Sequence, residues 1–157
     1  NIATKVAERA KAFGMNVVAY DKYVSSSNAA TLVPTVEDAV VDSDYISIHM
    51  PLTDETRNMF NAELFAKLRK KPVIVNAARG AIVNADDMVK ALDEGLVSWY
   101  CADVYPSDPP AEDYPLLKAE RVTLTPHVGA NSVENLLRIG DEIVDTIKAL
   151  REEGKID

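Results

Sequence analysis

The sequence predicts an α/β fold with a doubly wound parallel sheet between two layers of helices. Five short runs of apolar and β-branched residues recur along the chain, and helical stretches separate most of them. Strands that are apolar on both faces are typical of parallel sheets buried on both sides. With 157 residues, of which 47% are hydrophobic, the chain has the size and composition of one domain with a real core.

The expected helices and strands alternate along the chain. The first is a helix over residues 1–13, which Gly14 would end with a left-handed cap. Strands are expected at residues 17–20, 45–48, 72–75, 99–102 and 122–125. Further helices are expected at about residues 35–41, 61–70, 85–94 and 132–153. The first three of these begin at or beside a Thr or Asn that can cap them, and the last presents a broad apolar face.

The net charge and the cysteine count exclude several classes of protein. The chain carries 17 Lys and Arg against 25 Asp and Glu, which gives a net charge of −8. Because this charge would repel a phosphate backbone, a nucleic-acid partner is not expected. The single cysteine, Cys101, excludes an internal disulfide, and with two histidines it gives no recognisable set of metal ligands. No apolar stretch is long enough to cross a membrane, and none resembles a signal peptide. We therefore expect a cytoplasmic protein with no membrane partner.

Polar residues follow the predicted strands, at the sheet edge where parallel α/β folds bind their ligands. Among them, Arg79, Asp108 and His127 would bring a fixed cation, a carboxylate and a titratable base into one crevice. Taken singly, Arg79 is more often a solvated charge, and His127, next to Pro126, is more often a satisfied loop histidine. Their convergence at one edge is what indicates a site.

Three segments at these strand ends resemble the signatures of a known enzyme family. They are residues 76–83 (NAARGAIV), 102–109 (ADVYPSDP) and 125–130 (TPHVGA). In this order and at these separations they resemble the NAD-dependent D-isomer-specific 2-hydroxyacid dehydrogenases. Residues 12–21 and 49–57 resemble further passages of that family, so the resemblance covers essentially the whole chain. It implies an oxidoreductase acting on the CH–OH group of its donors, built on a Rossmann-type NAD-binding domain.

The resemblance implies that residues 1–157 form this NAD-binding domain without its N-terminal strand. In the family that strand ends in Gly-x-Gly-x-x-Gly, and Asn1, Ile2 and Ala3 align with the last three positions. Ala3 departs from the usual third glycine, at a position that serves helix–strand packing. The first strand, two glycines and a separate substrate domain are thus expected outside this sequence. If residues 1–157 stood alone, we would expect a fragment that binds nothing productively.

The resemblance also assigns cofactor contacts. Asp21 is expected to accept hydrogen bonds from the adenosine ribose and to repel the extra phosphate of NADP, although Lys22 beside it weakens this preference for NAD. Asn1 and Ile2 would offer backbone amides to the pyrophosphate, and Asp103 would hold the nicotinamide carboxamide. The other residues implied at the cofactor are Met50, Ala77, Ala78, Arg79, His127, Gly129 and Ala130. For the first two of these, ordinary packing is an equally good explanation.

Three catalytic roles follow from the resemblance. Arg79 would bind the substrate carboxylate and the adjacent oxygen, and would stabilise developing negative charge. His127 would remove the hydroxyl proton in oxidation and return it in reduction. Asp108 would orient the imidazole of His127 and favour its charged form. Most relatives carry glutamate at that position, so the shorter aspartate reaches His127 only if its loop sits closer.

The expected substrate rests on two loops. Residues 105–110 and 129–132 resemble the phosphoglycerate dehydrogenases of the family more than its lactate dehydrogenases, which predicts 3-phosphoglycerate and a role in serine biosynthesis. Glyoxylate or hydroxypyruvate is the alternative substrate. A hypothesis of another class is an NAD(H)-sensing binding protein like the C-terminal-binding corepressors, which keep the same three residues. The resemblance further implies a homodimer or homotetramer.

Overall fold

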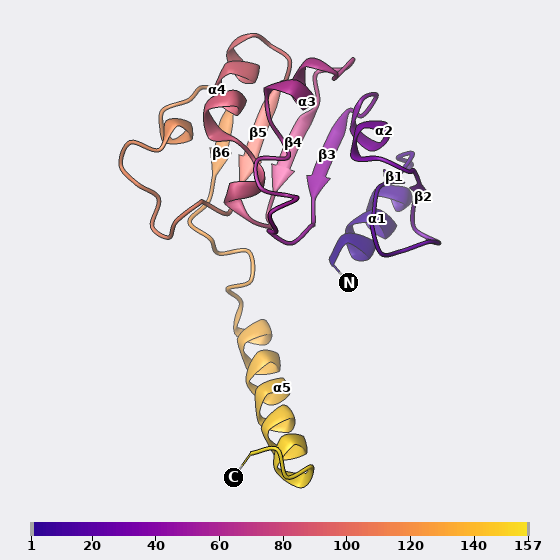
Figure 1. The fold of residues 1–157 in the computed structure, drawn as a ribbon, viewed down its shortest axis with the longest axis vertical. Helices are drawn as coiled ribbons and strands as arrows, with labels where there is room; N and C mark the ends of the chain where they lie inside the picture. The colour runs from indigo at the N-terminus through magenta and orange to yellow at the C-terminus, as the bar shows by residue number, and fades with distance from the viewer. Residues whose placement is uncertain (1, 157) are drawn as a thin grey trace. The chain divides into compact units, whose positions relative to one another are not determined.

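The computed structural model describes residues 2–156, and the chain divides into two compact units, Asn1–Pro126 and His127–Asp157. Figure 1 shows the first unit as a sheet with its helices and the second as a single long helix. Within residues 2–156, no helix combines the length and the apolar character that a membrane span needs.

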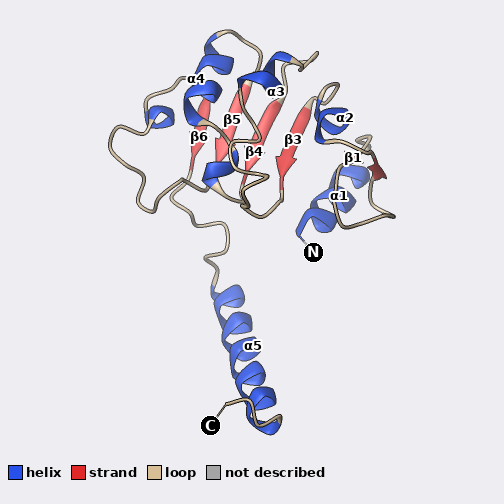
Figure 2. Cartoon of the chain, in the orientation of Figure 1, coloured by secondary structure: helices blue, strands red, loops and turns tan. Residues whose placement is uncertain are grey.

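The first unit contains two parallel sheets, drawn in red in Figure 2. The larger one joins β3 (Tyr45–Ile48), β4 (Val73–Asn76), β5 (Trp99–Ala102) and β6 (Val122–Leu124) in that order. The smaller one pairs β1 (Val18–Ala19) with β2 (Thr31–Leu32). The parallel α/β class predicted from the sequence is confirmed, and β3 and β5 have the predicted bounds.

The strand register separates a buried face of the larger sheet from an exposed one. Ile46, Ile74 and Tyr100 are paired across neighbouring strands and are all buried. Tyr45 and Trp99, one residue earlier on the other face, stay 63% and 41% exposed. Within the first unit, the helical cover that was predicted for both faces is therefore present on one of them.

Helices α3 (Ala62–Ala66) and α4 (Ala85–Asp93) cover the buried face, together with the 3₁₀ turns η1 (Gly80–Ile82) and η2 (Pro115–Leu117). Their apolar side chains form one core with the strands, with Phe65, Met88 and Leu116 each at most 1% exposed. This core holds the strand ends, and the loops that follow them, in place.

The predicted caps are present at all three of the shorter helices. Thr35 caps α2 (Val36–Val40) through Asp38 N–H, Asn61 caps α3 through Leu64 N–H, and Asn84 caps α4 through Asp87 N–H. Gly14 follows α1 (Ile2–Ala12) with a φ of +80°, as expected, and Gly95 follows α4 in the same way with a φ of +69°.

Two sequence expectations for single elements of the first unit need correction, and one strand was missed. Helix α3 ends at Ala66 instead of residue 70, because the backbone N–H of Arg69 donates to Val41 O and Pro72 follows closely. The strand expected at residues 17–20 has only two residues, because its partner in the described chain, β2, is itself only two residues long. Neither residue of this strand is buried. Strand β2 was not predicted at all.

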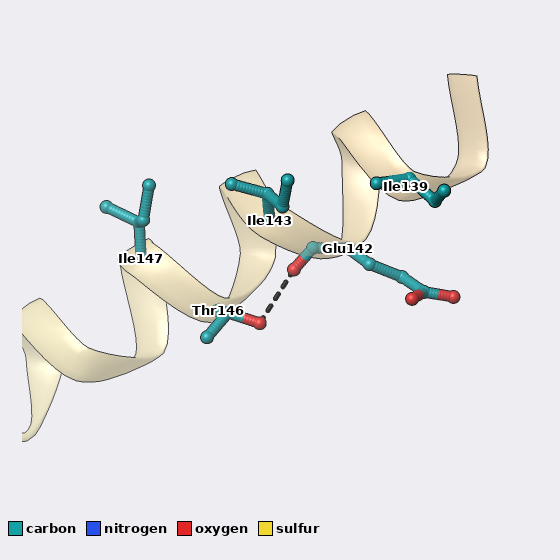
Figure 3. A pocket seen from close by; sticks show the side chains of 5 residues that line it. All are labelled: Ile139, Glu142, Ile143, Thr146 and Ile147. Carbon is teal, nitrogen blue, oxygen red and sulfur yellow. Dashed lines mark hydrogen bonds between the residues drawn. The ribbon is translucent and has the colours of Figure 1, made fainter. Parts of the chain in front are cut away.

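The second unit is dominated by α5 (Val133–Glu152), which Ser132 caps through Asn135 N–H, close to the predicted bounds. None of the helix residues is buried. Figure 3 shows Ile139, Ile143 and Ile147 along one side of the helix, with Thr146 donating its hydroxyl hydrogen bond to Glu142 O at 2.7 Å. Helix α5 is thus an amphipathic helix whose apolar side is exposed in this unit.

Candidate active site

A buried asparagine organises the loop that follows β4. Asn76 is the last residue of that strand and, among residues 2–156, the one buried polar residue of the core. Its Nδ2 donates to Arg79 O at 3.0 Å and to the Tyr100 hydroxyl at 3.3 Å, and its Oδ1 accepts from Ala78 N–H at 3.1 Å. Because these bonds satisfy a buried amide, they hold residues 77–79 in one conformation.

Gly80 lets the next loop pack directly against this one. A Cβ atom at Gly80 would lie 2.2 Å from the backbone carbon of Tyr105 and 2.6 Å from the nitrogen of Pro106. Backbone atoms cannot move aside as a flexible side chain can, so a residue without a side chain is required here. The loop after β4 and the loop after β5 are therefore in contact at the carboxyl edge of the sheet.

Arg79 sits between these two anchors and is exposed. Its Nη1 donates to the carbonyl oxygen of Ala78 at 2.6 Å, which ties the guanidinium to its own loop. The guanidinium has further N–H donors in a planar fork, a geometry that matches a carboxylate. The structure thus presents a cation at the predicted edge, on a backbone that the core holds in place.

The loop after β5 is tied to the end of β6. Asp103 accepts a hydrogen bond from the Thr125 hydroxyl, and the Tyr105 hydroxyl donates to Thr125 O at 2.9 Å. Tyr105 also packs edge to face on Tyr114, with ring centroids 5.9 Å apart. Burial raises the pKa of Tyr105 and raises that of Tyr114 to about 12, so both phenols stay neutral at physiological pH.

Asp108 and His127 lie in different units of the chain. Asp108 is exposed in the loop after β5, beside Ser107, whose hydroxyl donates to Pro109 O at 3.0 Å. His127 begins the second unit and has a left-handed backbone, with a φ of +55°, and the exposed Gly129 and Ala130 follow it. The structure therefore brings Arg79 and the loop carrying Asp108 together within the first unit, and the addition of His127 to them remains a proposal.

At the end of β1, the carboxylate of Asp21 is oriented by its own turn. Its Oδ1 accepts from Tyr23 N–H at 2.8 Å and from Val24 N–H at 3.2 Å, while Oδ2 remains for a ligand. The next side chain, Lys22, forms an ion pair with Glu55 from the loop after β3, with Nζ 2.5 Å from Oε2. Asp21 is thus an oriented acceptor on an exposed edge.

The remaining residues expected at the cofactor, and the neighbouring His49, differ in how far they are buried. Met50 and Ala78 are half-buried and pack against the core, as the packing explanation of Met50 anticipated, whereas Ala77 is exposed. Ile2 is exposed at the start of α1, and Asn1 lies outside the described residues. His49 is half-buried with its Nε2 2.9 Å from the Ser47 hydroxyl, and burial lowers its pKa.

Two residues that support the site were not singled out from the sequence. Gly80 was included only as part of the 76–83 signature, and Tyr100 only as a strand residue. A signal for the first was present, because glycine is common where two backbones approach closely, and Gly80 lies in the loop only four residues after β4 ends. No sequence signal paired Tyr100 with Asn76, since 24 residues separate them.

Comparison with known proteins identifies related sequences. Residues 1–129 match the family model of the D-isomer specific 2-hydroxyacid dehydrogenase NAD binding domain. Over 149 residues the chain is 38% identical to D-3-phosphoglycerate dehydrogenase 2, chloroplastic, of Arabidopsis thaliana, which covers 93% of this chain and 24% of that protein. Over 149 residues it is 36% identical to the hydroxypyruvate reductase of Thermotoga maritima, covering 94% of this chain and 49% of that one.

Among solved structures, a glyoxylate reductase from Paecilomyes thermophila superposes with a TM-score of 0.89 at 30% identity. The match covers 99% of this chain and 48% of that one. The chain thus spans about a quarter of the plant relative and about half of the other two proteins.

The contact at Gly80 predicts an unusually severe effect for a small substitution. We expect Gly80→Ala to destabilise the protein by more than 3 kcal/mol, roughly the cost of severe overpacking, because the new methyl group meets backbone atoms of the next loop. Gly140→Ala is the matched control, since nothing lies within 4 Å of a Cβ there and alanine favours a helix by about 1 kcal/mol. Urea unfolding of both variants measures the difference, and equal effects would contradict the contact.

The bonds of Asn76 predict an order of destabilisation between two variants. Tyr100→Phe removes one hydroxyl and should cost about 1 kcal/mol, because Asn76 keeps its other partners. Asn76→Ala should cost about 2–4 kcal/mol, because it leaves the Tyr100 hydroxyl, Arg79 O and Ala78 N–H without their partner. The free energy of unfolding in denaturant gives both values, and the reverse order would show that Asn76 does not hold the loop.

Proposed function

The chain belongs to the D-isomer specific 2-hydroxyacid dehydrogenases, in their NAD-binding domain, and on that basis we propose that its protein transfers a hydride between NAD(H) and a D-2-hydroxy or 2-oxo acid. The observation that carries the proposal is Arg79, held at the carboxyl edge of the sheet by Asn76 and Gly80. A fixed guanidinium at this edge suits a small carboxylate substrate beside a dinucleotide.

The residues at the sheet edge fit a bound dinucleotide. Asp21 keeps one oxygen for the hydroxyls of the adenosine ribose, and the ion pair of Lys22 with Glu55 joins its turn to the loop after β3, which also carries Met50. The Thr125 hydroxyl donates a hydrogen bond to Asp103 and orients its carboxylate. Because a carboxylate accepts hydrogen bonds, it suits the amide donor of the nicotinamide. NAD supplies the hydride acceptor of the reaction, and the proposed contacts also include Asn1, Ile2, Ala77, Ala78, Arg79, His127, Gly129 and Ala130.

In the proposed mechanism, Arg79 binds the substrate carboxylate and the oxygen on the adjacent carbon. In reduction, negative charge develops on that oxygen, and a preorganised guanidinium stabilises it without reorganising during the step. His127 protonates the same oxygen, and in oxidation it removes the hydroxyl proton. Asp108 orients the imidazole and stabilises its charged form.

We propose 3-phosphoglycerate as the hydroxy acid, and hence a role in serine biosynthesis. The similarity to the D-3-phosphoglycerate dehydrogenase of Arabidopsis thaliana over nearly the whole chain supports this choice. The similarity to a hydroxypyruvate reductase and the superposition on a glyoxylate reductase favour a second candidate, reduction of hydroxypyruvate or glyoxylate. We further propose that the protein is cytoplasmic and that it forms the homodimer or homotetramer that the family resemblance implies.

A substrate screen with the full-length protein separates these candidates. NADH oxidation is followed at 340 nm with phosphohydroxypyruvate, hydroxypyruvate, glyoxylate and pyruvate at equal concentrations. We expect kcat/KM to be about tenfold or more higher for phosphohydroxypyruvate, since an added phosphate offers further charged contacts. A preference for hydroxypyruvate or glyoxylate would establish the second candidate, and NADH binding without turnover of any of them would indicate a sensor.

The role of Asp108 predicts a shift of the pH–rate profile. In the Asp108→Asn variant, the positive charge on His127 loses its carboxylate, so the pH above which reduction slows should fall. Asp113→Asn, a substitution in the same loop, is the matched control and should leave the profile unchanged. The profile of kcat/KM for reduction between pH 5 and 9 measures the shift, and superimposable profiles for all three proteins would remove Asp108 from the mechanism.

A further inference from the structure

An ion pair lies directly beside the residue proposed to bind the adenosine ribose. Lys22 follows Asp21 in the chain, and its Nζ is 2.5 Å from Oε2 of Glu55. Both side chains are more than half exposed, at 51% and 69%. The hydrogen bond to Glu55 raises the pKa of Lys22, so the ammonium is charged throughout the physiological range.

The pair joins two loops that follow different strands. Lys22 belongs to the turn after β1, which the Asp21 carboxylate organises through Tyr23 N–H and Val24 N–H. Glu55 belongs to the loop after β3, in a turn where the Thr56 hydroxyl donates to Pro51 O at 2.7 Å. Each partner is therefore carried by an internally hydrogen-bonded turn.

The charges of these residues bear on the choice between NAD and NADP, which differ by a phosphate on the 2′-hydroxyl of that ribose. A cation beside the ribose accommodates the phosphate, and a carboxylate repels it. With Lys22 alone, the charge of Asp21 would be balanced. With Glu55 bound to the lysine, the three side chains carry a net charge of −1 and the ammonium is already engaged.

We propose that Glu55 is a specificity-determining residue, which engages Lys22 and thereby excludes dinucleotides that carry a 2′-phosphate. This inference rests on the proposed function, in which the adenosine ribose lies at Asp21. It adds that discrimination does not come from Asp21 alone: the lysine that would favour NADP is neutralised by a glutamate 33 residues further along the chain.

Binding measurements on the full-length protein test this proposal. Dissociation constants of NAD⁺ and NADP⁺ are measured by calorimetry for the unsubstituted protein, Glu55→Gln, Lys22→Met and the double variant. We expect Glu55→Gln to tighten NADP⁺ binding by about three- to tenfold, the range for one exposed charge, with NAD⁺ affinity changed less than twofold. The gain should shrink in 0.5 M NaCl, where the Debye length is only about 4 Å.

Two variants make the result specific to this pair. The double variant should lose the gain in NADP⁺ affinity, because no lysine remains to bind the phosphate. Glu37→Gln is the matched control, since Glu37 also forms a surface ion pair, with Lys67 at 2.9 Å and with both side chains at least 40% exposed, and it should change neither affinity.

The outcomes separate this inference from the proposed function. An unchanged ratio of the NADP⁺ and NAD⁺ constants in Glu55→Gln would overturn the role of Glu55, and so would a gain that persists in the double variant. An unsubstituted protein that binds neither dinucleotide would overturn the proposed function and this inference with it.

Discussion

The satisfied, buried amide of Asn76 is the interaction on which the rest of the site depends. Asn76 is the last residue of β4 and is paired with a residue of β3 on one side and of β5 on the other. Its side chain bonds to the loop that follows and holds that loop in one conformation. A buried amide that lacked these partners would cost about 1–3 kcal/mol per unsatisfied group, so alternative loop conformations are disfavoured. The conformation of the loop and the position of Arg79 thus follow from one side chain.

Local contacts also decide which charged side chains at the sheet edge are available to a ligand. The chain carries a net charge of −8, although the proposed cofactor and substrate are anions. A mean repulsion over the surface is screened within about 8 Å at physiological ionic strength, so nearby cations decide where an anion binds. Arg79 remains exposed with donors for a ligand, whereas Lys22 is engaged by Glu55. Under the proposed function, this difference between the two cations would direct an anionic group to Arg79 and away from Lys22.

Local features of this fold could be predicted from the sequence, and contacts between distant residues could not. Strands β3 and β5 are short apolar runs with clear limits, and the caps of α2, α3 and α4 depend on side chains within three residues. Strand β2 has only two residues, Thr31 and Leu32, which is too short for the alternation that marks a strand in a sequence. The contact of Gly80 with Tyr105 joins two loops and that of Asn76 with Tyr100 joins two strands, and no local periodicity reports either of them.

The arrangement around Arg79 also explains how an exposed residue can be well positioned. An arginine side chain has several rotatable bonds, and its ordering on an exposed surface costs about 2 kcal/mol of conformational entropy. Here part of that cost is met before any ligand binds, because the backbone is held by Asn76 and by the glycine contact, and the guanidinium is bonded to Ala78 O. Electrostatic stabilisation is most effective when the donors need not move as charge develops. A rigid backbone under an exposed guanidinium would therefore combine access for the proposed substrate with preorganisation for the proposed reaction.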